Sequence, residues 1–451
     1  MMKTLVELSA KLKNQEVKSV DLTKECLDKI MDISSEGSRV FLRDYSRQAN
    51  AAAEVSDRMR AHGRTLSPID GIPVSIKDLF DVKDEDTLAG SMVRTGCNPA
   101  DDNSYVVNRL REAGAVIVGR TNMSEFAFSG VGTNPHYGTP LNPYDRKSGR
   151  IPGGSSSGAA VAVADQMCFA SICSDTGGSA RIPAALCGLT GFKPTKKRIP
   201  CDGMFPLSKT LDSVGVIAAS TSCCMIMDSI LCPEKQEPIK PFPIAGLRLA
   251  IPQNIMLDDL SDEVAAVFEK TISYLSKNGA VITEIPMEEL SRITEFNKSG
   301  GIVSAEAFAV HRNMMAKHSA GYDPKVLVRI EQGVHFSAHD YIDLLEERDN
   351  LIKKANKNTF EFDALIMPTV PIAAPRVDDV VDSVEYRRIN RLLLRNTCVW
   401  NALDRCAISL PCHNQGEVPV GLMLVGETMG DRKLFAVALG VEMVLNLMRD
   451  I

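Results

Sequence analysis

The chain has no run of about 18 apolar residues, the length that a membrane-spanning helix requires. Its N-terminal residues lack the apolar segment and the small-residue cleavage site of a signal peptide. A net charge of −6 provides no positive surface for a phosphate backbone, so direct nucleic-acid binding is disfavoured. We therefore expect a cytoplasmic protein that binds neither a membrane nor a nucleic acid.

Metal and cofactor motifs are also missing. The 12 cysteines include no Cys-x-x-Cys pair, which argues against a zinc ribbon or a dithiol redox site. His335 and His339 are four positions apart, but no glutamate follows the first and no third ligand is evident, so we interpret them as surface residues. The glycine-serine stretch at 153–158 lacks the lysine of a phosphate-binding loop. We expect no metal and no cofactor.

Helical and strand-like segments alternate along most of the 451 residues. Residues 1–65 are predicted to be helical at their start, where Leu5, Leu8 and Leu12 share one face. Short apolar strands then alternate with helices, as at 104–113 and 115–118, which is typical of an α/β protein. Residues 233–243, rich in proline and charge, mark either a domain boundary or a surface crossing. We favour one large α/β/α domain whose central mixed, mostly parallel sheet is covered by helices on both faces.

Residues 150–195 contain two Gly-Gly-Ser turns, and their serines, Ser155 and Ser179, are 24 positions apart. Two glycines before a serine allow turns and close backbone approaches that a Cβ would prevent. The segment between the two turns consists mostly of small and apolar residues, interrupted at 165–166 by an aspartate and a glutamine. We therefore expect a buried segment that presents both hydroxyls into one place.

A serine hydroxyl becomes a nucleophile only when a neighbouring base takes its proton. None of the seven histidines lies in the glycine-serine stretch, and no G-x-S-x-G turn surrounds Ser179. A buried, neutral lysine is the alternative base, and Lys77, at the end of the apolar strand 72–76, has the right local character. Consecutive N–H groups at 175–179 would suit an oxyanion. From these residues alone, a catalytic site and a structural glycine turn remain equally open.

Longer motifs carry a family resemblance. Residues 71–78 read Gly-Ile-Pro-Val-Ser-Ile-Lys-Asp, residues 175–184 read Asp-Thr-Gly-Gly-Ser-Ala-Arg-Ile-Pro-Ala, and residues 187–195 read Cys-Gly-Leu-Thr-Gly-Phe-Lys-Pro-Thr. Together with the glycine-serine turn at 153–158, they resemble the amidase signature family. Weaker similarity extends over the whole chain, at residues 119–126, 212–215, 367–369 and 419–422.

The resemblance implies a Ser–cis-Ser–Lys triad. By position, Ser179 would be the nucleophile, Ser155 would relay protons after a cis Gly154–Ser155 bond, and Lys77 would be the base. Ser156 would be a further hydrogen-bonding partner. The oxyanion hole would be formed by four backbone N–H groups, those of Thr176, Gly177, Gly178 and Ser179. Residues 66–220 would then be the catalytic core, and residues 244–451 would contribute to the substrate pocket.

The sequence departs from the family pattern in two places. Ser157 stands where the family commonly has glycine and Ala159 where it has serine, and neither position belongs to the triad. Near the C-terminus, Asp404 and Arg405 replace small or apolar residues. We hypothesise that one of this pair faces the substrate pocket and reads a polar or carboxylate-bearing acyl group. The alternative is an ion pair with a structural role only.

The resemblance implies an amidohydrolase that acts alone on a small carboxylic amide. Two other functions stay open, because the catalytic stretch is shared among them. One is the glutaminase subunit of glutamyl-tRNA(Gln) amidotransferase, although residues 340–344 lack the tyrosine-rich helix expected there. The other is a hydrolase of a urea derivative such as allophanate. The expected partner is a small-molecule amide, and a homodimer is open.

Overall fold

An 11-stranded sheet runs through the whole molecule, in the strand order β1-β3-β2-β4-β6-β5-β10-β11-β9-β7-β8. The structure is a computed structural model, and it describes residues 2–234, 237–298 and 300–449. The strands are β1 (Phe41–Asp44), β2 (Pro73–Lys77), β3 (Val116–Thr121), β4 (Ala170–Ser174), β5 (Thr190–Lys193), β6 (Val214–Ala218), β7 (Arg248–Pro252), β8 (Val281–Ile285), β9 (Ala364–Pro368), β10 (Ala407–Pro411) and β11 (Gly421–Val425).

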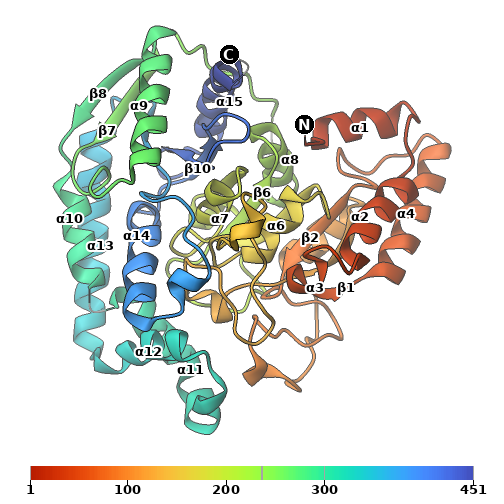
Figure 1. The fold of residues 1–451 in the computed structure, drawn as a ribbon, viewed down its shortest axis with the longest axis horizontal. Helices are drawn as coiled ribbons and strands as arrows, with labels where there is room; N and C mark the ends of the chain where they lie inside the picture. The colour runs from red at the N-terminus through yellow and green to blue at the C-terminus, as the bar shows by residue number, and fades with distance from the viewer. Residues whose placement is uncertain (1, 235–236, 299, 450–451) are drawn as a thin grey trace.

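Fifteen helices surround this sheet in the described part of the chain. They are α1 (Leu5–Lys13), α2 (Ser19–Met31), α3 (Gly37–Val40), α4 (Ser46–Ala61), α5 (Tyr105–Glu112), α6 (Ser157–Ala164), α7 (Arg181–Leu186), α8 (Thr221–Leu231), α9 (Asp262–Lys277), α10 (Glu288–Asn297), α11 (Gly301–His318), α12 (Pro324–Glu331), α13 (Ala338–Thr359), α14 (Ser383–Ala402) and α15 (Asp431–Arg449). The N-terminal helices α1, α2 and α4 lie at one end of the molecule, and α10 and α13 lie at the opposite end (Figure 1). None of these helices combines the length and apolar character needed to cross a membrane.

Helices cover both faces of the sheet, as predicted. Side chains of successive strand residues point to opposite faces. Ile366 and Leu424 belong to a core cluster that includes residues of α8, α9 and α15. Leu365 and Met423 belong to a different cluster, which includes residues of α10, α13 and α14. The predicted α/β domain with a central mixed sheet is therefore confirmed.

The prediction that the sheet is mostly parallel is wrong. Of the ten strand pairings in the described residues, four are parallel and six are antiparallel. Strand β6 runs antiparallel to both β4 and β5, and β10 is joined to the antiparallel β11 by residues 412–420. The five residues of β4, β6 and β10 are all buried, so their continuous apolar runs resemble those of parallel strands.

The proline-rich segment around 233–243 is a surface crossing, in its described part, rather than a break in the sheet. The N–H of Phe242 donates to the carbonyl of Ala436 in α15 at 2.9 Å. A Cβ on Gly440 would lie 2.0 Å from the Phe242 carbonyl oxygen, so a glycine is required where the segment crosses α15. Residues 235–236 lie outside the described residues.

Candidate active site

Lys77 is the last residue of β2, whose five residues are all buried, and its own side chain is 0% exposed. Its Nζ donates hydrogen bonds to three serine hydroxyls: Ser155 Oγ at 2.7 Å, Ser156 Oγ at 2.9 Å and Ser174 Oγ at 2.9 Å. The structure therefore brings together the three sequence-predicted residues Lys77, Ser155 and Ser156. Ser174, at the end of β4, was not predicted, because a lone serine that ends an apolar strand belongs to no motif.

The turn that carries Ser155 depends on its two glycines. Gly153 has φ +77°, and a Cβ on Gly154 would lie 2.6 Å from the backbone nitrogen of Gly132. The Gly154–Ser155 peptide bond is cis, as the family resemblance implies. Helix α6 begins directly after this turn, at Ser157, and its residues through Val163 are buried. Residues 159–163 belong to a core cluster that also contains Val116 and Val118 of β3.

Burial changes the protonation of Lys77. Loss of hydration lowers the pKa of its ammonium group to about 7, against an ordinary value of 10.5. The nearby Cys173, Asp175 and Asp212 act in the opposite direction, but their combined effect is smaller. The hydroxyls that surround Nζ carry no formal charge to hold its proton. Near neutral pH, an appreciable fraction of Lys77 is therefore an uncharged amine with a free lone pair.

Ser179 lies at the end of the loop that follows β4, and it is 3% exposed. The N–H of Gly178 in this loop donates to Asp175 Oδ1 at 2.9 Å. This hydrogen bond engages one of the four N–H groups expected to form the oxyanion hole, and the role of Gly178 there stays a prediction. The backbone N–H groups of Thr176, Gly177 and Ser179 donate to no group in the described part of the chain.

Helix α14 holds this loop from the other side. Thr397 Oγ1 donates to the carbonyl of Gly177 at 2.6 Å. A Cβ on Gly178, which has φ +132°, would lie 2.2 Å from the same Oγ1, so only glycine fits between the loop and the helix. The side chain of Thr176 is fixed separately, because it donates to Asp212 Oδ1 at 2.6 Å.

A buried ion pair anchors the start of the loop. Arg181 Nη2 lies 2.8 Å from Asp175 Oδ1, and both side chains are 0% exposed. Burial raises the pKa of Asp175, but the charge and hydrogen bonds of Arg181 outweigh burial and hold it at about 2. Asn401 Nδ2 of α14 also donates to Asp175 Oδ1, at 2.9 Å. The carboxylate thus stays ionised and keeps the Gly178 N–H engaged.

We expect Arg181→Met to destabilise the protein by about 3–5 kcal/mol, because it leaves the Asp175 carboxylate buried without its partner. Urea unfolding of the variant and the wild type measures this difference. Arg388→Met is the matched control, since Arg388 forms its ion pair with Glu385 on the exposed surface of α14 and should change the unfolding free energy little. An Arg181→Met protein as stable as the wild type would contradict this role.

Lys77 and its partners Ser155, Ser156 and Ser174 form what we call the serine-lysine cluster. The structure does not bring Asp404 and Arg405 to this cluster. Arg405 is 2% exposed, and its guanidinium donates to Thr359 Oγ1 at 2.7 Å and to the Gly426 carbonyl at 3.3 Å. Asp404 Oδ1 accepts a hydrogen bond from the Lys196 N–H at 3.0 Å. Neither an ion pair between the two residues nor a bond from them to Ser179 is found among the described side chains. Their role in reading the substrate stays a prediction.

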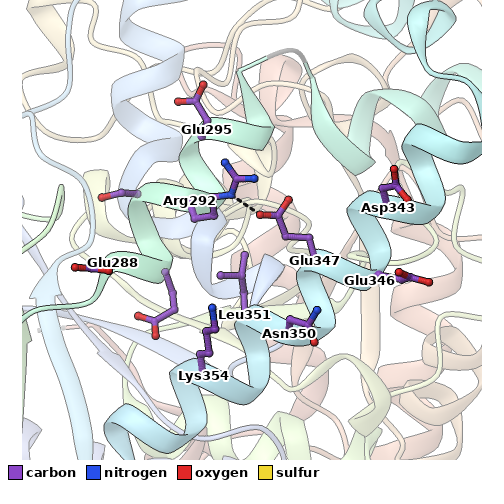
Figure 2. Close-up of a pocket in the computed structure, with 11 residues that line it drawn as sticks. Glu288, Arg292, Glu295, Asp343, Glu346, Glu347, Asn350, Leu351 and Lys354 are labelled. Carbon is purple, nitrogen blue, oxygen red and sulfur yellow. Dashed lines mark hydrogen bonds and ion pairs between the residues drawn. The ribbon is translucent and has the colours of Figure 1, made fainter.

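A surface cavity of about 760 Å³ lies elsewhere, between α10 and α13 (Figure 2). Its lining is dominated by carboxylates, with one ion pair between Arg292 and Glu347. The lining residues include Glu288, Glu289, Glu295, Asp343, Glu346 and Glu347. No residue of the serine-lysine cluster lines this cavity. Among the described residues, no group of three or more His, Cys, Asp or Glu side chains is arranged to hold a metal ion.

Comparison with known proteins gives the family. The amidase family model matches residues 21–435. The chain therefore belongs to the amidase family, whose members hydrolyse C–N bonds of amides, and the resemblance inferred from its motifs is confirmed.

Several relatives are similar over nearly their whole length. The chain is 31% identical to the 2-amino-5-chloromuconic acid deaminase of Comamonas testosteroni, over 98% of this chain and 96% of the relative. It is also 31% identical to the A subunit of the glutamyl-tRNA(Gln) amidotransferase of Chloroflexus aggregans, over 94% of this chain and 92% of the relative. A crystal structure of an amidase superposes with a TM-score of 0.88 at 29% identity, covering 97% of this chain and 99% of that one.

Proposed function

We propose that this protein hydrolyses a small carboxylic amide through an acyl-enzyme on Ser179, with Ser155 as the proton relay and Lys77 as the base. The observation that carries the proposal is the buried Lys77 amine, with a pKa of about 7, placed 2.7 Å from Ser155 Oγ. A lysine that is uncharged near neutral pH can accept a proton, whereas an ordinary lysine cannot. Membership of the amidase family supports the same reaction.

The first half of the reaction forms the acyl-enzyme. Neutral Lys77 accepts a proton from Ser155, and Ser155 accepts one from Ser179 as its Oγ attacks the amide carbonyl. The proposal requires the Ser179 hydroxyl to come within hydrogen-bond distance of Ser155 Oγ when substrate is bound, since no hydrogen bond joins the two among the described residues. In this proposal the N–H groups of Thr176, Gly177 and Ser179, which donate to no group among the described residues, stabilise the negative oxygen of the tetrahedral intermediate.

The second half releases both products. When the intermediate collapses, the C–N bond breaks and the relay returns a proton to the departing nitrogen, which leaves as ammonia or an amine. Water then attacks the ester carbonyl, and the relay accepts one of its protons. The C–O bond to Ser179 breaks, the acid leaves, and Ser179 recovers its hydroxyl proton. The base therefore ends each cycle in its starting protonation state.

The mechanism predicts that kcat/KM rises with pH through about 7 and then levels off. Burial lowers the pKa of Lys77, so the proton-accepting neutral form predominates above about 7 and is lost as pH falls below it. Ammonia release measured at low substrate concentration between about pH 5 and about pH 9 gives the profile. A profile that is flat through neutral pH, or that falls as pH rises, would contradict Lys77 as the base.

The glutaminase alternative has its own support. The amidotransferase relative from Chloroflexus aggregans matches this chain along nearly all of its length, so similarity alone does not separate the two functions. Purified chain should be assayed for glutamine hydrolysis alone and with the other subunits of such an amidotransferase. Hydrolysis of simple amides by the chain alone supports the stand-alone enzyme. Activity on glutamine that requires the other subunits supports the alternative.

Substrate identity needs a panel of amides. Short aliphatic, aromatic, dicarboxylic and ureido amides cover the stand-alone and urea-derivative functions. The Comamonas relative is named for an aminomuconic acid, and muconic acid has two carboxyl groups, which favours an acidic substrate within the panel. We expect ammonia release from at least one carboxylic amide. Hydrolysis of ureido compounds alone would favour the urea-derivative function instead.

A further inference from the structure

Asp212 is a buried carboxylate that the proposed proton relay does not use. It is 4% exposed, and no lysine, arginine or histidine forms an ion pair with it among the described residues. Burial raises the pKa of Asp212 to about 6, and the charge of Glu306 adds to this effect, while the hydrogen bonds that Asp212 accepts oppose it. An ionised carboxylate that is buried without a cation lowers the stability of the folded state. Carboxylates in this state are typical of functional sites.

The sheet places Asp212 at the edge that holds Lys77. Strand β4 lies between β2 and β6, and Ser174, which ends β4, is paired with Val214 of β6. Ser174 Oγ accepts a hydrogen bond from Lys77 Nζ at 2.9 Å. Asp212 comes two residues before Val214 in the chain. The carboxylate therefore lies at the same edge of the sheet as the serine-lysine cluster.

The two oxygens of this carboxylate join two segments of the chain. Oδ1 accepts a hydrogen bond from Thr176 Oγ1 at 2.6 Å, and Oδ2 accepts one from the Leu207 N–H at 3.0 Å. Thr176 belongs to the loop that leads to Ser179, and its own N–H donates to no group among the described residues. An asparagine at 212 would accept only one of these bonds, because its amide nitrogen is a donor. An ionised aspartate accepts both.

Glu306 of α11 holds the turn that carries Asp212. Its carboxylate accepts hydrogen bonds from Ser208 Oγ, from the Thr210 N–H at 3.0 Å and from Thr210 Oγ1 at 2.5 Å. The Asp212 N–H donates to the Ser208 carbonyl at 2.8 Å, which closes the turn. Tyr341 Oη of α13 donates to the same Glu306 at 2.6 Å. Two helices of the C-terminal half therefore fix the backbone of Asp212.

We propose that Asp212 is a positioning residue for the proposed hydrolysis: its carboxylate holds Thr176 so that the Thr176 N–H stays directed at the oxyanion of the tetrahedral intermediate. This inference rests on the proposed acyl-enzyme mechanism and deepens it. Backbone donors stabilise a developing charge best when they are held in place before the charge forms. With pKa values of about 6 for Asp212 and about 7 for Lys77, the carboxylate is ionised wherever the base is neutral.

The kinetic test separates kcat from KM. Asp212→Asn should lower kcat for amide hydrolysis by about 10- to 100-fold and leave KM within about twofold, since a misplaced donor weakens binding of the transition state only. Asp202→Asn is the matched control, because Asp202 lies exposed in the same loop and should change neither constant. Ammonia release at varied amide concentration gives both constants. A wild-type kcat in Asp212→Asn, with KM unchanged or raised, would overturn the inference.

Variants of Thr176 test the contact itself. Thr176→Val removes the hydroxyl that Asp212 binds and keeps the shape of the side chain, so its loss of kcat should match that of Asp212→Asn. The double variant should be no slower than the slower single variant, because both changes remove one interaction. Thr176→Ser keeps the hydroxyl and should keep nearly the wild-type kcat. Additive losses in the double variant, or a Thr176→Ser enzyme as slow as Thr176→Val, would overturn the inference.

Thermal unfolding separates positioning from a purely structural role. Because the pKa of Asp212 is raised in the folded state, its ionisation costs stability, and this cost is fully present above about pH 6. At pH 8, Asp212→Asn should therefore unfold at the wild-type temperature or above it. A marked fall in melting temperature, with kcat and KM both impaired, would make Asp212 a structural residue and overturn the inference.

Ser179→Ala distinguishes failure of this inference from failure of the proposed function. Loss of activity in Ser179→Ala, together with wild-type kinetics in Asp212→Asn and Thr176→Val, would overturn the inference and leave the acyl-enzyme mechanism intact. Activity retained in Ser179→Ala would overturn the mechanism, and the role of Asp212 with it. Loss of activity in Ser179→Ala with a lowered kcat and unchanged KM in Asp212→Asn is the result that we expect.

Discussion

Ser179→Ala is expected to lower kcat/KM for amide hydrolysis by about 10⁴-fold or more, because no acyl-enzyme can form without its hydroxyl. The folded state should be unaffected, since Ser179 Oγ donates to no other group in the described structure and alanine fits the space of a serine. Ammonia release and thermal unfolding of the purified variant measure the two effects.

Ser75→Ala is the matched control for this variant. Ser75 is a buried serine of β2, two positions before Lys77. Its hydroxyl donates to Ser171 Oγ at 2.8 Å, and it forms no hydrogen bond with Lys77, Ser155 or Ser179 among the described residues. Its replacement should keep nearly full activity. If Ser179→Ala retained activity within tenfold of the wild type, the nucleophile would have to be another group.

Lys77→Met is expected to lower kcat/KM by about 10³- to 10⁴-fold, the contribution of a well-placed general base. Methionine keeps most of the buried volume but removes the amine that accepts the proton from Ser155. The neutral-pH step in the pH profile should disappear together with the activity. A variant that lost activity but kept this step would show that a different group titrates.

Ser174→Ala tests whether the effect comes from the base or from packing. Ser155 and Ser174 both accept a hydrogen bond from the same Nζ, at 2.7 Å and 2.9 Å. Only Ser155 lies on the proposed proton path, so Ser155→Ala should approach the loss seen in Lys77→Met. Ser174→Ala should cost about tenfold at most, as the loss of one positioning hydrogen bond. Equal losses in both serine variants would contradict a relay through Ser155.

Local sequence predicted the elements of the fold better than the direction of its strands. Helix α9 follows from the apolar spacing of Val264, Phe268 and Leu275, and these three side chains are buried as the pattern requires. Strand direction carries no such signal, because β6 is buried along its length whether its neighbours run parallel or antiparallel. The connections between strands decide it, and they depend on the packing of the whole chain.

In the candidate site, too, local motifs indicated some residues, while others depend on segments that are distant in the sequence. The two Gly-Gly-Ser turns are local, and they indicate Ser155 and Ser179 without reference to any family. Lys77 lies 78 positions before Ser155, and only its place at the end of an apolar strand marked it. Asp175 accepts a hydrogen bond from the Gly178 N–H, a contact that the letters of the motif do not encode.

The hypothesis that Asp404 or Arg405 reads the substrate shows where the sequence carries too little information. The charged pair departs from the family pattern, but the letters do not say where the two side chains lie. Arg405 is buried and donates to Thr359 Oγ1 and to the Gly426 carbonyl, while its Nε has no hydrogen-bond partner among the described residues. Asp404 accepts a hydrogen bond from the Lys196 N–H. These contacts join segments that are far apart along the chain, so they depend on the tertiary structure.

Labelling with phenylmethylsulfonyl fluoride, followed by peptide mass spectrometry, tests the central claim most directly. The reagent sulfonylates serines that are activated as nucleophiles, and the wild-type protein should carry one adduct, on the peptide that contains Ser179. The adduct should be missing in Ser179→Ala and should form much more slowly in Lys77→Met. A folded wild-type protein with an unmodified Ser179, or an adduct on another serine that persists in Ser179→Ala, would contradict the account.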